Sequence, residues 1–322
     1  MTEEILPNLY RIEVPIPQNP LKAINSYVIK ADERSLIIDT GMNRKECMDV
    51  LFSGLKELSV DLKKADFFIT HLHADHSGLV STLATDTSTI YFNQADADRF
   101  NSPNFGQRAT DLARMNGFPE DEVQHAFQSH PGNRYSSRGQ LDFNILKEGD
   151  TINIGDYLFK CIETPGHTKG HMCLYEASKK LLISGDHILI DITPNISLWS
   201  DDENPLNEYL VSLDKVYDLD VKLVLPGHRR TFSNHKERIQ ELKHHHQTRA
   251  NEVLSILKRG SKNAFQVASQ MSWDLTYKSW EQFPIPQKWF ATGETISHLK
   301  YLEDKGKIRR EIKKQKIVFS LK

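Results

Sequence analysis

Four side chains that can bind a metal ion occur within six residues of this chain, in the sequence HLHADH. They are His71, His73, Asp75 and His76, and they follow a short apolar segment, Phe67–Thr70. His71 and His73 can project in the same direction at the end of a strand, because side chains alternate there with a period of two. Asp75 and His76 fall in the turn beyond and can point at a second centre. A solvated polar loop would explain one such histidine, but it does not explain the packed set.

Three later fragments each place a candidate ligand after an apolar segment. TPGH ends at His167, SGDH contains Asp186, and LPGH ends at His228. The Gly and Pro residues beside each ligand favour a sharp turn from strand to loop. Imidazole and carboxylate ligands suit Zn²⁺, while Fe and Mn accept similar sets. Seven ligands are too many for one tetrahedral ion, so the sequence predicts two divalent metal ions, with Zn²⁺ as the expected metal.

The segments around these motifs alternate between strand and helix character. Expected strands at 9–14, 23–30 and 35–38 precede an amphipathic helix at 45–58, and a second series of strands lies between 151 and 184. Two such series predict an α/β fold, an αββα sandwich of two mixed β-sheets flanked by helices. Residues 1–235 are expected to form this catalytic domain. Residues 101–140, which are long and polar, are expected to form a helical insertion or lid that borders the substrate pocket.

The chain changes character after His228. A long polar helix is expected at 234–258, followed by two helical segments at 264–271 and 295–303 and a basic hairpin at 307–321. This order predicts a linking helix and a small winged-helix-like domain over residues 236–322. Residues 300–322 contain nine Lys or Arg and three Asp or Glu. A solvated helix end explains this charge, and single-stranded RNA bound through the basic wing is the alternative.

The composition is that of an ordinary globular protein. Hydrophobic residues make up 39% and charged residues 26%, and the net charge is −2, which gives no overall reason to expect nucleic acid or a membrane. The three cysteines form no CxxC pair, so free thiols are expected. No apolar segment reaches the roughly 20 residues that span a bilayer, and the first residues lack a secretory signal. A cytoplasmic location is therefore expected. The sequence leaves open whether the chain forms a homodimer.

The motifs HLHADH, PGHTKGH, SGDHIL and LPGH, with LIIDTGM upstream, resemble the ordered motifs of the metallo-β-lactamase superfamily over about residues 8–230. The resemblance implies that His71, His73 and His167 hold one metal, that Asp75, His76 and His228 hold the second, and that Asp186 bridges them. It implies that Asp39 orients a ligand imidazole. Members with di-iron redox chemistry have Glu where this chain has His73, so the hydrolase pattern is present. Lys169 and Arg229 depart from the usual Pro and Gly without removing a ligand.

Two close cations lower the pKa of a shared water and provide a bridging hydroxide, which predicts a hydrolase. Asp75 and Asp186 are the expected catalytic carboxylates. The leading substrate class is a small thioester, ester or lactone, as in glyoxalase II, which this chain resembles. The alternatives are a phosphodiesterase or endoribonuclease, as in the group that includes β-lactamase-like protein 2, and a nucleic-acid-binding regulatory protein with a non-catalytic metal site. Every expected ligand precedes residue 230, so removal of the tail is expected to spare small substrates.

The other histidines carry weaker signals. His171 is expected to make a structural hydrogen bond, and His187 either lines the pocket or packs internally. The remaining ones are expected at the surface: His125, His130, His235 and residues 244–246.

Overall fold

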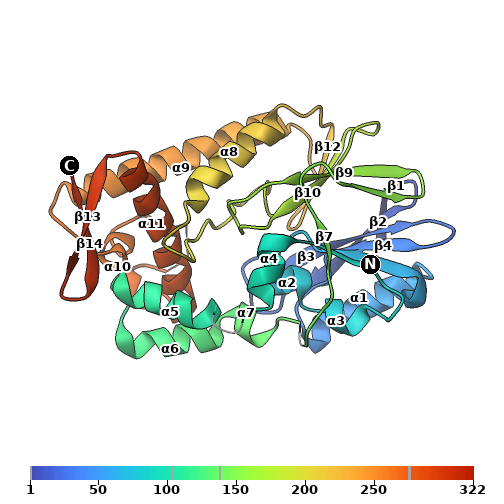
Figure 1. The fold of residues 1–322 in the computed structure, drawn as a ribbon, viewed down its shortest axis with the longest axis horizontal. Coiled ribbons are helices and arrows are strands. Elements are labelled where there is room, and N and C mark those ends of the chain that lie inside the picture. The colour runs from blue at the N-terminus through green and yellow to red at the C-terminus, as the bar shows by residue number, and fades with distance from the viewer. Residues whose placement is uncertain (1, 103–104, 138, 275–276) are drawn as a thin grey trace.

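The computed structural model describes residues 2–102, 105–137, 139–274 and 277–322, and it contains two mixed sheets that face each other (Figure 1). The first has the order β1 (Thr2–Leu6), β2 (Leu9–Pro15), β3 (Ala23–Lys30), β4 (Ser35–Ile38), β5 (Ala65–Phe68), β6 (Ile90–Asn93) and β7 (Asn144–Leu146). The second has the order β12 (Leu223–Pro226), β11 (Leu181–Gly185), β10 (Met172–Glu176), β9 (Tyr157–Glu163) and β8 (Thr151–Ile154). The αββα prediction is confirmed.

The main core lies between the sheets. Leu36, Ile38 and Phe68 from the first sheet belong to the same buried cluster as Phe159 and Leu174 from the second. Each such side chain contributes about 1.5–3 kcal/mol when it leaves water. Both faces of the central strands are covered, which explains why β4 and β5 are buried at every residue.

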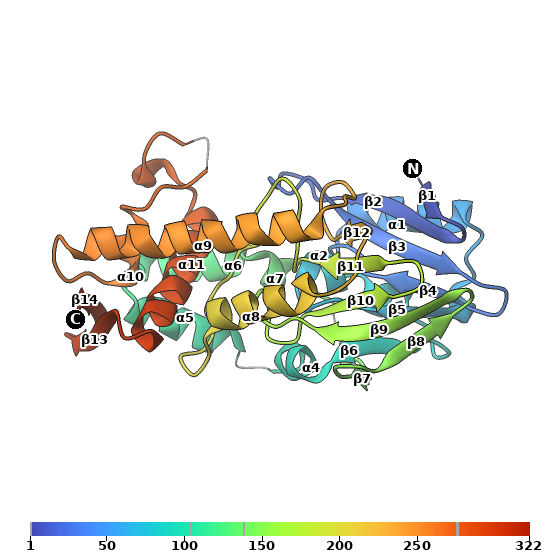
Figure 2. The ribbon, with the colours of Figure 1, turned by 90° about the horizontal axis from the view of Figure 1, so that it is seen from above.

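Helices cover the outer faces of the sandwich (Figure 2). Helix α1 (Lys45–Glu57) packs Cys47 and Leu51 against the first sheet. Helices α8 (Pro205–Tyr217) and α9 (His235–Leu257) cover the second sheet. Short helices α2 (Ala74–Ser77), α3 (Val80–Leu83) and α4 (Gln94–Phe100) occupy the crossovers near the ends of β5 and β6.

The segment 101–140 contains α5 (Phe105–Met115), α6 (Glu120–Ser129) and α7 (Pro131–Arg134), and its residues 103–104 and 138 lie outside the described residues. Helices α5 and α6 pack against the C-terminal elements α10 (Ala264–Ala268) and α11 (Ile285–Asp304) (Figure 1). The Phe265 amide donates to the Asn116 carbonyl at 3.1 Å. Lys316 donates to the carbonyl of Arg114 at 2.8 Å. The insertion is therefore held by the C-terminal part of the chain.

A small antiparallel sheet of β13 (Ile308–Lys313) and β14 (Lys316–Leu321) ends the chain. Two strands, β1 and β7, were not predicted. Helix α11 begins well before the predicted segment at 295, because Pro286 lies in its first turn, where a missing N–H costs no hydrogen bond.

The three cysteines are free and buried. Among the helices of the described residues, none combines the length and apolar character that crossing a membrane requires.

Candidate metal centre

The predicted ligands come from four loops that meet at one edge of the sandwich. The HLHADH loop follows β5, and His167 lies in the turn after β9. Asp186 directly follows β11, and His228 follows β12. Strands β11 and β12 are parallel, so their carboxyl ends bring Asp186 and His228 together. Pairing of neighbouring strands therefore gathers residues that are far apart in the sequence.

The seven side chains form three overlapping groups, and within each group one ligand atom per residue lies within 4.8 Å of the others. The groups are His71, His73 and His167; His71, His76 and Asp186; and Asp75, His76 and His228. The first and third groups coincide with the two sets implied by the sequence motifs. His71 Nε2 and His73 Nδ1 are 3.0 Å apart, so both nitrogens face the same point.

Asp186 lies between the first and third groups. Its Oδ2 atom is 3.6 Å from His167 Nε2 and 3.4 Å from His228 Nε2. Its Oδ1 atom is 3.5 Å from His76 Nε2. One carboxylate thus reaches an imidazole of each group, which is the placement that a shared ligand requires.

The ring nitrogens that face away from the centre are held by hydrogen bonds. His76 Nδ1 is 2.7 Å from Asp39 Oδ2, the position expected for Asp39. The Nδ1 atoms of His167 and His228 donate to the carbonyls of Asn195 and Ala23, each at 2.7 Å. Such outer partners fix the ring orientation and leave Nε2 as the free ligand atom.

Four of the atoms that face the centre lack hydrogen bonds in the described part of the chain. Nε2 of His76, His167 and His228 and Oδ1 of Asp186 are buried without a hydrogen-bond partner in the described part of the chain. Buried polar atoms are normally paired, so a convergent set of unpaired ones calls for an explanation. Divalent cations would satisfy all of them, and the nitrogen and carboxylate donor set suits Zn²⁺. The residues present therefore fit a metal centre.

Burial lowers the pKa of His71, His73 and His167, and neighbouring imidazoles add to the effect at His71 and His73. The three rings are therefore neutral at pH 7, as metal ligands need to be.

The other side of the centre is rich in negative charge. Burial opposes protonation of His76 and His228, but the surrounding carboxylates outweigh it. They raise the pKa of His76 well above its usual value and that of His228 to about 10. Burial also opposes ionisation of Asp75 and Asp186, but nearby histidines lower the pKa of both carboxyls. Two ionised carboxylates in a buried site provide the field that a divalent cation requires.

Two positions that depart from the usual motifs have structural explanations. Arg229 has φ +69°, a left-handed conformation that explains why Gly is common after this motif. The Arg229 carbonyl accepts a hydrogen bond from the Asn25 side chain at 2.8 Å. Lys169 lies 3.4 Å from Glu203, which also pairs with Arg99.

Asp96 on α4 was not among the site residues predicted from the sequence. Its buried carboxylate accepts hydrogen bonds from the Leu72 amide at 2.9 Å, the Thr168 hydroxyl at 2.7 Å and the Gly170 amide at 2.8 Å. Asp96 therefore ties the HLHADH loop to the loop that carries His167. Nothing in the sequence distinguishes Asp96 from the nearby Asp98, which is exposed.

Three histidines differ from the surface expectation. His235 and His246 are buried, and the Nε2 atom of His130 is buried as well. Each lies on a polar segment, but packing against other helices covers it. His171 makes the structural hydrogen bonds expected of it, since its Nε2 accepts from the Asp186 amide at 3.1 Å.

Comparisons with known proteins agree with this geometry. Acyl-coenzyme A thioesterase MBLAC2 of Homo sapiens is 27% identical over 225 residues, 65% of this chain and 74% of that protein. Probable metallo-hydrolase YqjP of Bacillus subtilis is 26% identical over 315 residues, 94% of this chain and 93% of that protein. The solved structure of a metallo-beta-lactamase family protein from Thermus thermophilus gives a TM-score of 0.83 at 26% identity, covering 99% of this chain and 100% of that one.

The family model of the metallo-beta-lactamase superfamily matches residues 20–228. The match spans more than half of the chain and includes all seven residues of the candidate centre. The chain therefore belongs to the metallo-beta-lactamase superfamily.

Proposed function

We propose that this protein is a metal-dependent thioesterase that hydrolyses acyl thioesters such as acyl-coenzyme A. The observation that carries the proposal is the convergence of seven ligand side chains, several of whose inward atoms lack hydrogen bonds within the described residues. The similarity to an acyl-coenzyme A thioesterase supports the substrate class. His73 supports hydrolysis, because superfamily members with di-iron redox chemistry have Glu at this position.

The first group, His71, His73 and His167, would hold one divalent ion. The second group, Asp75, His76 and His228, would hold another, and Asp186 would contribute to both. Bound ions would supply a nucleophile at neutral pH and polarise the substrate carbonyl. Zn²⁺ is the expected metal because the set contains five imidazoles and two carboxylates.

The protein groups have separate tasks in this proposal. The Asp75 side chain is 12% exposed, so its carboxylate can reach a water molecule that enters the site. Nearby histidines keep this carboxyl ionised, and it therefore acts as a hydrogen-bond acceptor that orients the attacking water. Asp186 maintains the separation of the two groups. Asp39 fixes the ring of His76 through a 2.7 Å hydrogen bond.

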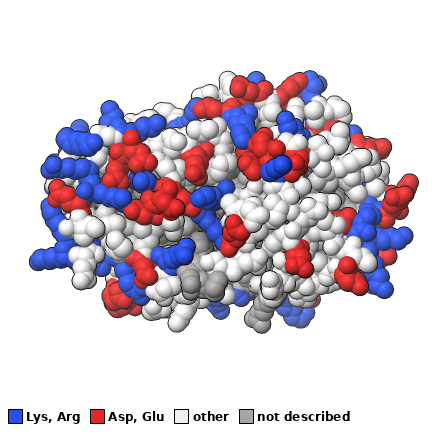
Figure 3. Space-filling model, viewed as in Figure 1, with Lys and Arg blue, Asp and Glu red and all other residues white. Residues whose placement is uncertain are grey.

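Part of the basic charge of the C-terminal hairpin is already paired with carboxylates. Arg310 pairs with Asp201 and lies 3.1 Å from Glu303. Glu311 lies 3.7 Å from Arg309 and 3.0 Å from Lys313. Basic and acidic groups are interspersed over this end of the molecule (Figure 3). Charge that is already paired gains less from phosphates. Together with the similarity to an acyl-coenzyme A thioesterase, this pairing supports the thioesterase over the ribonuclease.

The test is a substrate panel with metal analysis. Protein purified without chelator and reloaded with Zn²⁺ is expected to hold two ions per chain. We expect kcat/KM for acyl-coenzyme A substrates to exceed that for lactones, phosphodiesters and single-stranded RNA by at least about 100-fold, which corresponds to about 2.7 kcal/mol in transition-state stabilisation. A preference for phosphodiester or RNA would contradict the proposal. So would full thioesterase activity in protein that retains no metal after dialysis against chelator.

A further inference from the structure

His130 lies at the end of the insertion, beside the metal centre. It is the N-cap of α7, and its Nδ1 atom accepts a hydrogen bond from the Gly132 amide at 3.1 Å. The segment that follows is fixed to the loop after β4, since the Tyr135 carbonyl accepts from the Asn43 amide at 2.9 Å. That carbonyl approaches Gly78 so closely that a Cβ atom there would lie 2.5 Å from it. The position of His130 is therefore fixed relative to α2, the helix that carries Asp75.

The hydrogen bond to Gly132 determines where the imidazole carries its proton. An Nδ1 atom that accepts from an amide has no proton, so the neutral ring of His130 is protonated at Nε2. Burial lowers the pKa of His130 to about 4, which keeps the ring neutral at pH 7. A protonated Nε2 cannot ligate a metal ion, so His130 is not an eighth ligand. It is a hydrogen-bond donor without charge.

This donor has no acceptor. His130 Nε2 is buried and has no hydrogen-bond partner among the described residues. Such a donor is costly to bury and rare in folded proteins, so it calls for an acceptor that arrives later. Helix α7 follows His130 directly, and the Tyr135 carbonyl at its end lies against Gly78, two residues after His76, which places this part of the insertion near the second metal group. The Asp75 carboxylate accordingly acts to raise the pKa of His130, against the larger effect of burial.

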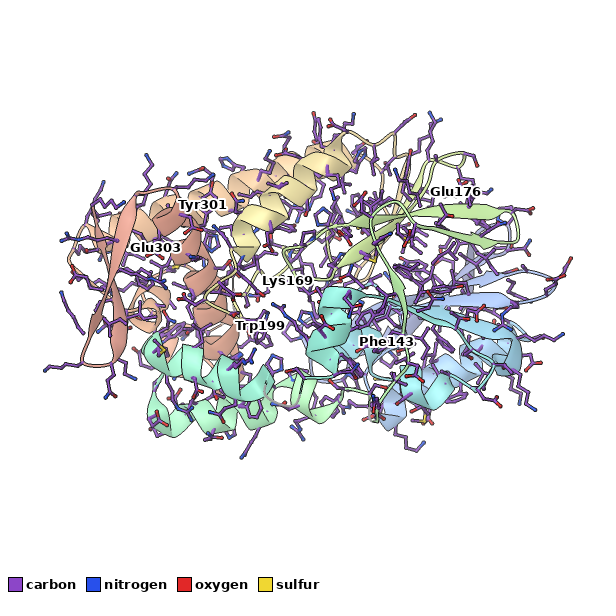
Figure 4. All side chains as sticks on the ribbon, viewed as in Figure 1. Phe143, Lys169, Glu176, Trp199, Tyr301 and Glu303 are labelled. Atoms are coloured by element: carbon purple, nitrogen blue, oxygen red, sulfur yellow. The ribbon has the colours of Figure 1, made fainter. Side chains whose placement is uncertain are left out.

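The rings next to His130 form an apolar wall. Trp199 packs edge-on at a centroid distance of 5.9 Å, and Phe290 of α11 lies at 5.3 Å. Trp199 lies between α11 and the insertion helices (Figure 4). It follows Asn195 by four residues, the residue whose carbonyl orients His167. A molecule that reaches the centre along this wall meets aromatic faces and one neutral N–H group.

We propose that His130 binds the substrate, its Nε2–H donating a hydrogen bond to the acyl carbonyl oxygen while Trp199 and Phe290 contact the acyl chain. This inference rests on the proposed thioesterase function and specifies how the acyl group is bound. A neutral donor beside aromatic rings suits an uncharged carbonyl with an apolar substituent. A phosphate group would instead favour a cation such as Arg or Lys.

Two variants separate the donor from the cap. Asn at position 130 can still accept from the Gly132 amide, because Asn is a strong N-cap, but it has no group at the position of Nε2. Gln at 130 places an amide N–H near that position and loses the cap. Both variants lose the ring contacts with Trp199 and Phe290. They therefore differ from each other only in the proposed contact, which His130→Gln keeps, and in the cap, which His130→Asn keeps.

The experiment measures kcat/KM on an acyl-coenzyme A, metal content, thermal unfolding, and binding of a ketone analogue whose carbonyl is separated from sulfur by a methylene group. In His130→Asn, we expect unchanged metal content and a smaller fall in unfolding temperature than in His130→Gln, with kcat/KM and ketone affinity reduced by about 10- to 100-fold. In His130→Gln, kcat/KM should stay within about threefold of wild type, while the unfolding temperature falls.

Wild-type kinetics and ketone binding in His130→Asn would overturn the proposal, because the donor would be unused. Equal loss in both variants with lower metal content would also overturn it, because the effect would then follow the insertion. A different result would show that the thioesterase proposal itself is wrong. In that case wild type would hydrolyse no thioester, but ketone binding that depends on His130 would still support the contact.

Discussion

Gly227 is the position where one added methyl group should damage the metal centre most directly. A Cβ atom built on Gly227 would lie 2.5 Å from Asp186 Oδ1 and 2.8 Å from His76 Cε1. The backbone cannot move away, because the Gly227 amide donates to the Gly185 carbonyl at 2.8 Å. The Gly227 carbonyl accepts from the Asn25 amide at 2.7 Å. The displacement therefore falls on the two side chains.

The size of this displacement follows from the contact distances. Non-bonded heavy atoms rest at about 3.5 Å or more, so Asp186 Oδ1 would have to move by roughly 1 Å. Metal sites tolerate deviations of about 0.2 Å in ligand distance. A shift several times larger is incompatible with a ligand shared between two ions. We therefore expect Gly227→Ala to retain at most one metal ion and to lose at least about 100-fold in kcat/KM.

The matched control is Gly54→Ala. There the Cβ atom would lie 2.8 Å from Ile12 Cδ1, in the core under α1 and away from the centre. Overpacking at either position should cost about 1–3 kcal/mol of unfolding free energy. Only Gly227→Ala should lose metal, as measured by elemental analysis after reloading and desalting. Two ions per chain and wild-type hydrolysis in folded Gly227→Ala would refute the steric reasoning.

Three further outcomes are expected. Asp186→Asn should lower turnover by at least about 1,000-fold and reduce the bound metal below two per chain, because one neutral amide replaces the shared carboxylate; elemental analysis and steady-state kinetics check this. Metal removal by a chelator should lower the unfolding free energy, and readdition at 100 times Kd should restore about 2.7 kcal/mol, as measured by denaturant unfolding. Burial lowers the pKa of His298 to about 4, whereas the unfolded value is near 6.5, so the unfolded chain binds the extra proton between these values. Stability should therefore fall as pH drops below 6.5, by about 2 kcal/mol at pH 5 from this group, with a smaller slope in His298→Asn.

The seven ligand residues were predictable because each stands in a short motif at the end of a strand, where neighbouring motifs necessarily meet. The two sheets were predictable because strand-like and helix-like segments alternate along the sequence. Asn195 was not predictable, since it orients His167 through a backbone carbonyl that any residue possesses. His130 and Asp96 depend on packing between segments far apart in the chain, and their sequence surroundings are ordinary polar helices. The prediction placed the start of helix α11 at 295 and not at Ile285, because the proline and aromatic residues before 295 do not show helical spacing.

The C-terminal part of the chain reaches the centre, although every candidate ligand precedes residue 230. Glu294 of α11 accepts a hydrogen bond from the Asn195 side chain at 3.0 Å, and the Asn195 carbonyl accepts from His167. The same helix contributes Phe290 beside His130. We therefore propose that residues 236–322 support the site and that truncation after 258 would abolish hydrolysis of small substrates as well.

Glu294→Ala tests this coupling without removing the helix. Asn195 would lose its acceptor, so we expect metal affinity to fall by about 10-fold, the lower end of the effect of outer partners. Arg249, whose Nε lies 3.7 Å from Glu294 Oε1, would lose a carboxylate partner in a largely buried position. The free energy of unfolding should therefore fall as well. Glu303→Ala on the same helix is the control, because Glu303 pairs with Arg310 of the hairpin rather than with the site. If chelator competition gave equal metal affinities for the two folded variants, α11 would act only as packing, and the route from Glu294 to His167 would carry no influence on the metals.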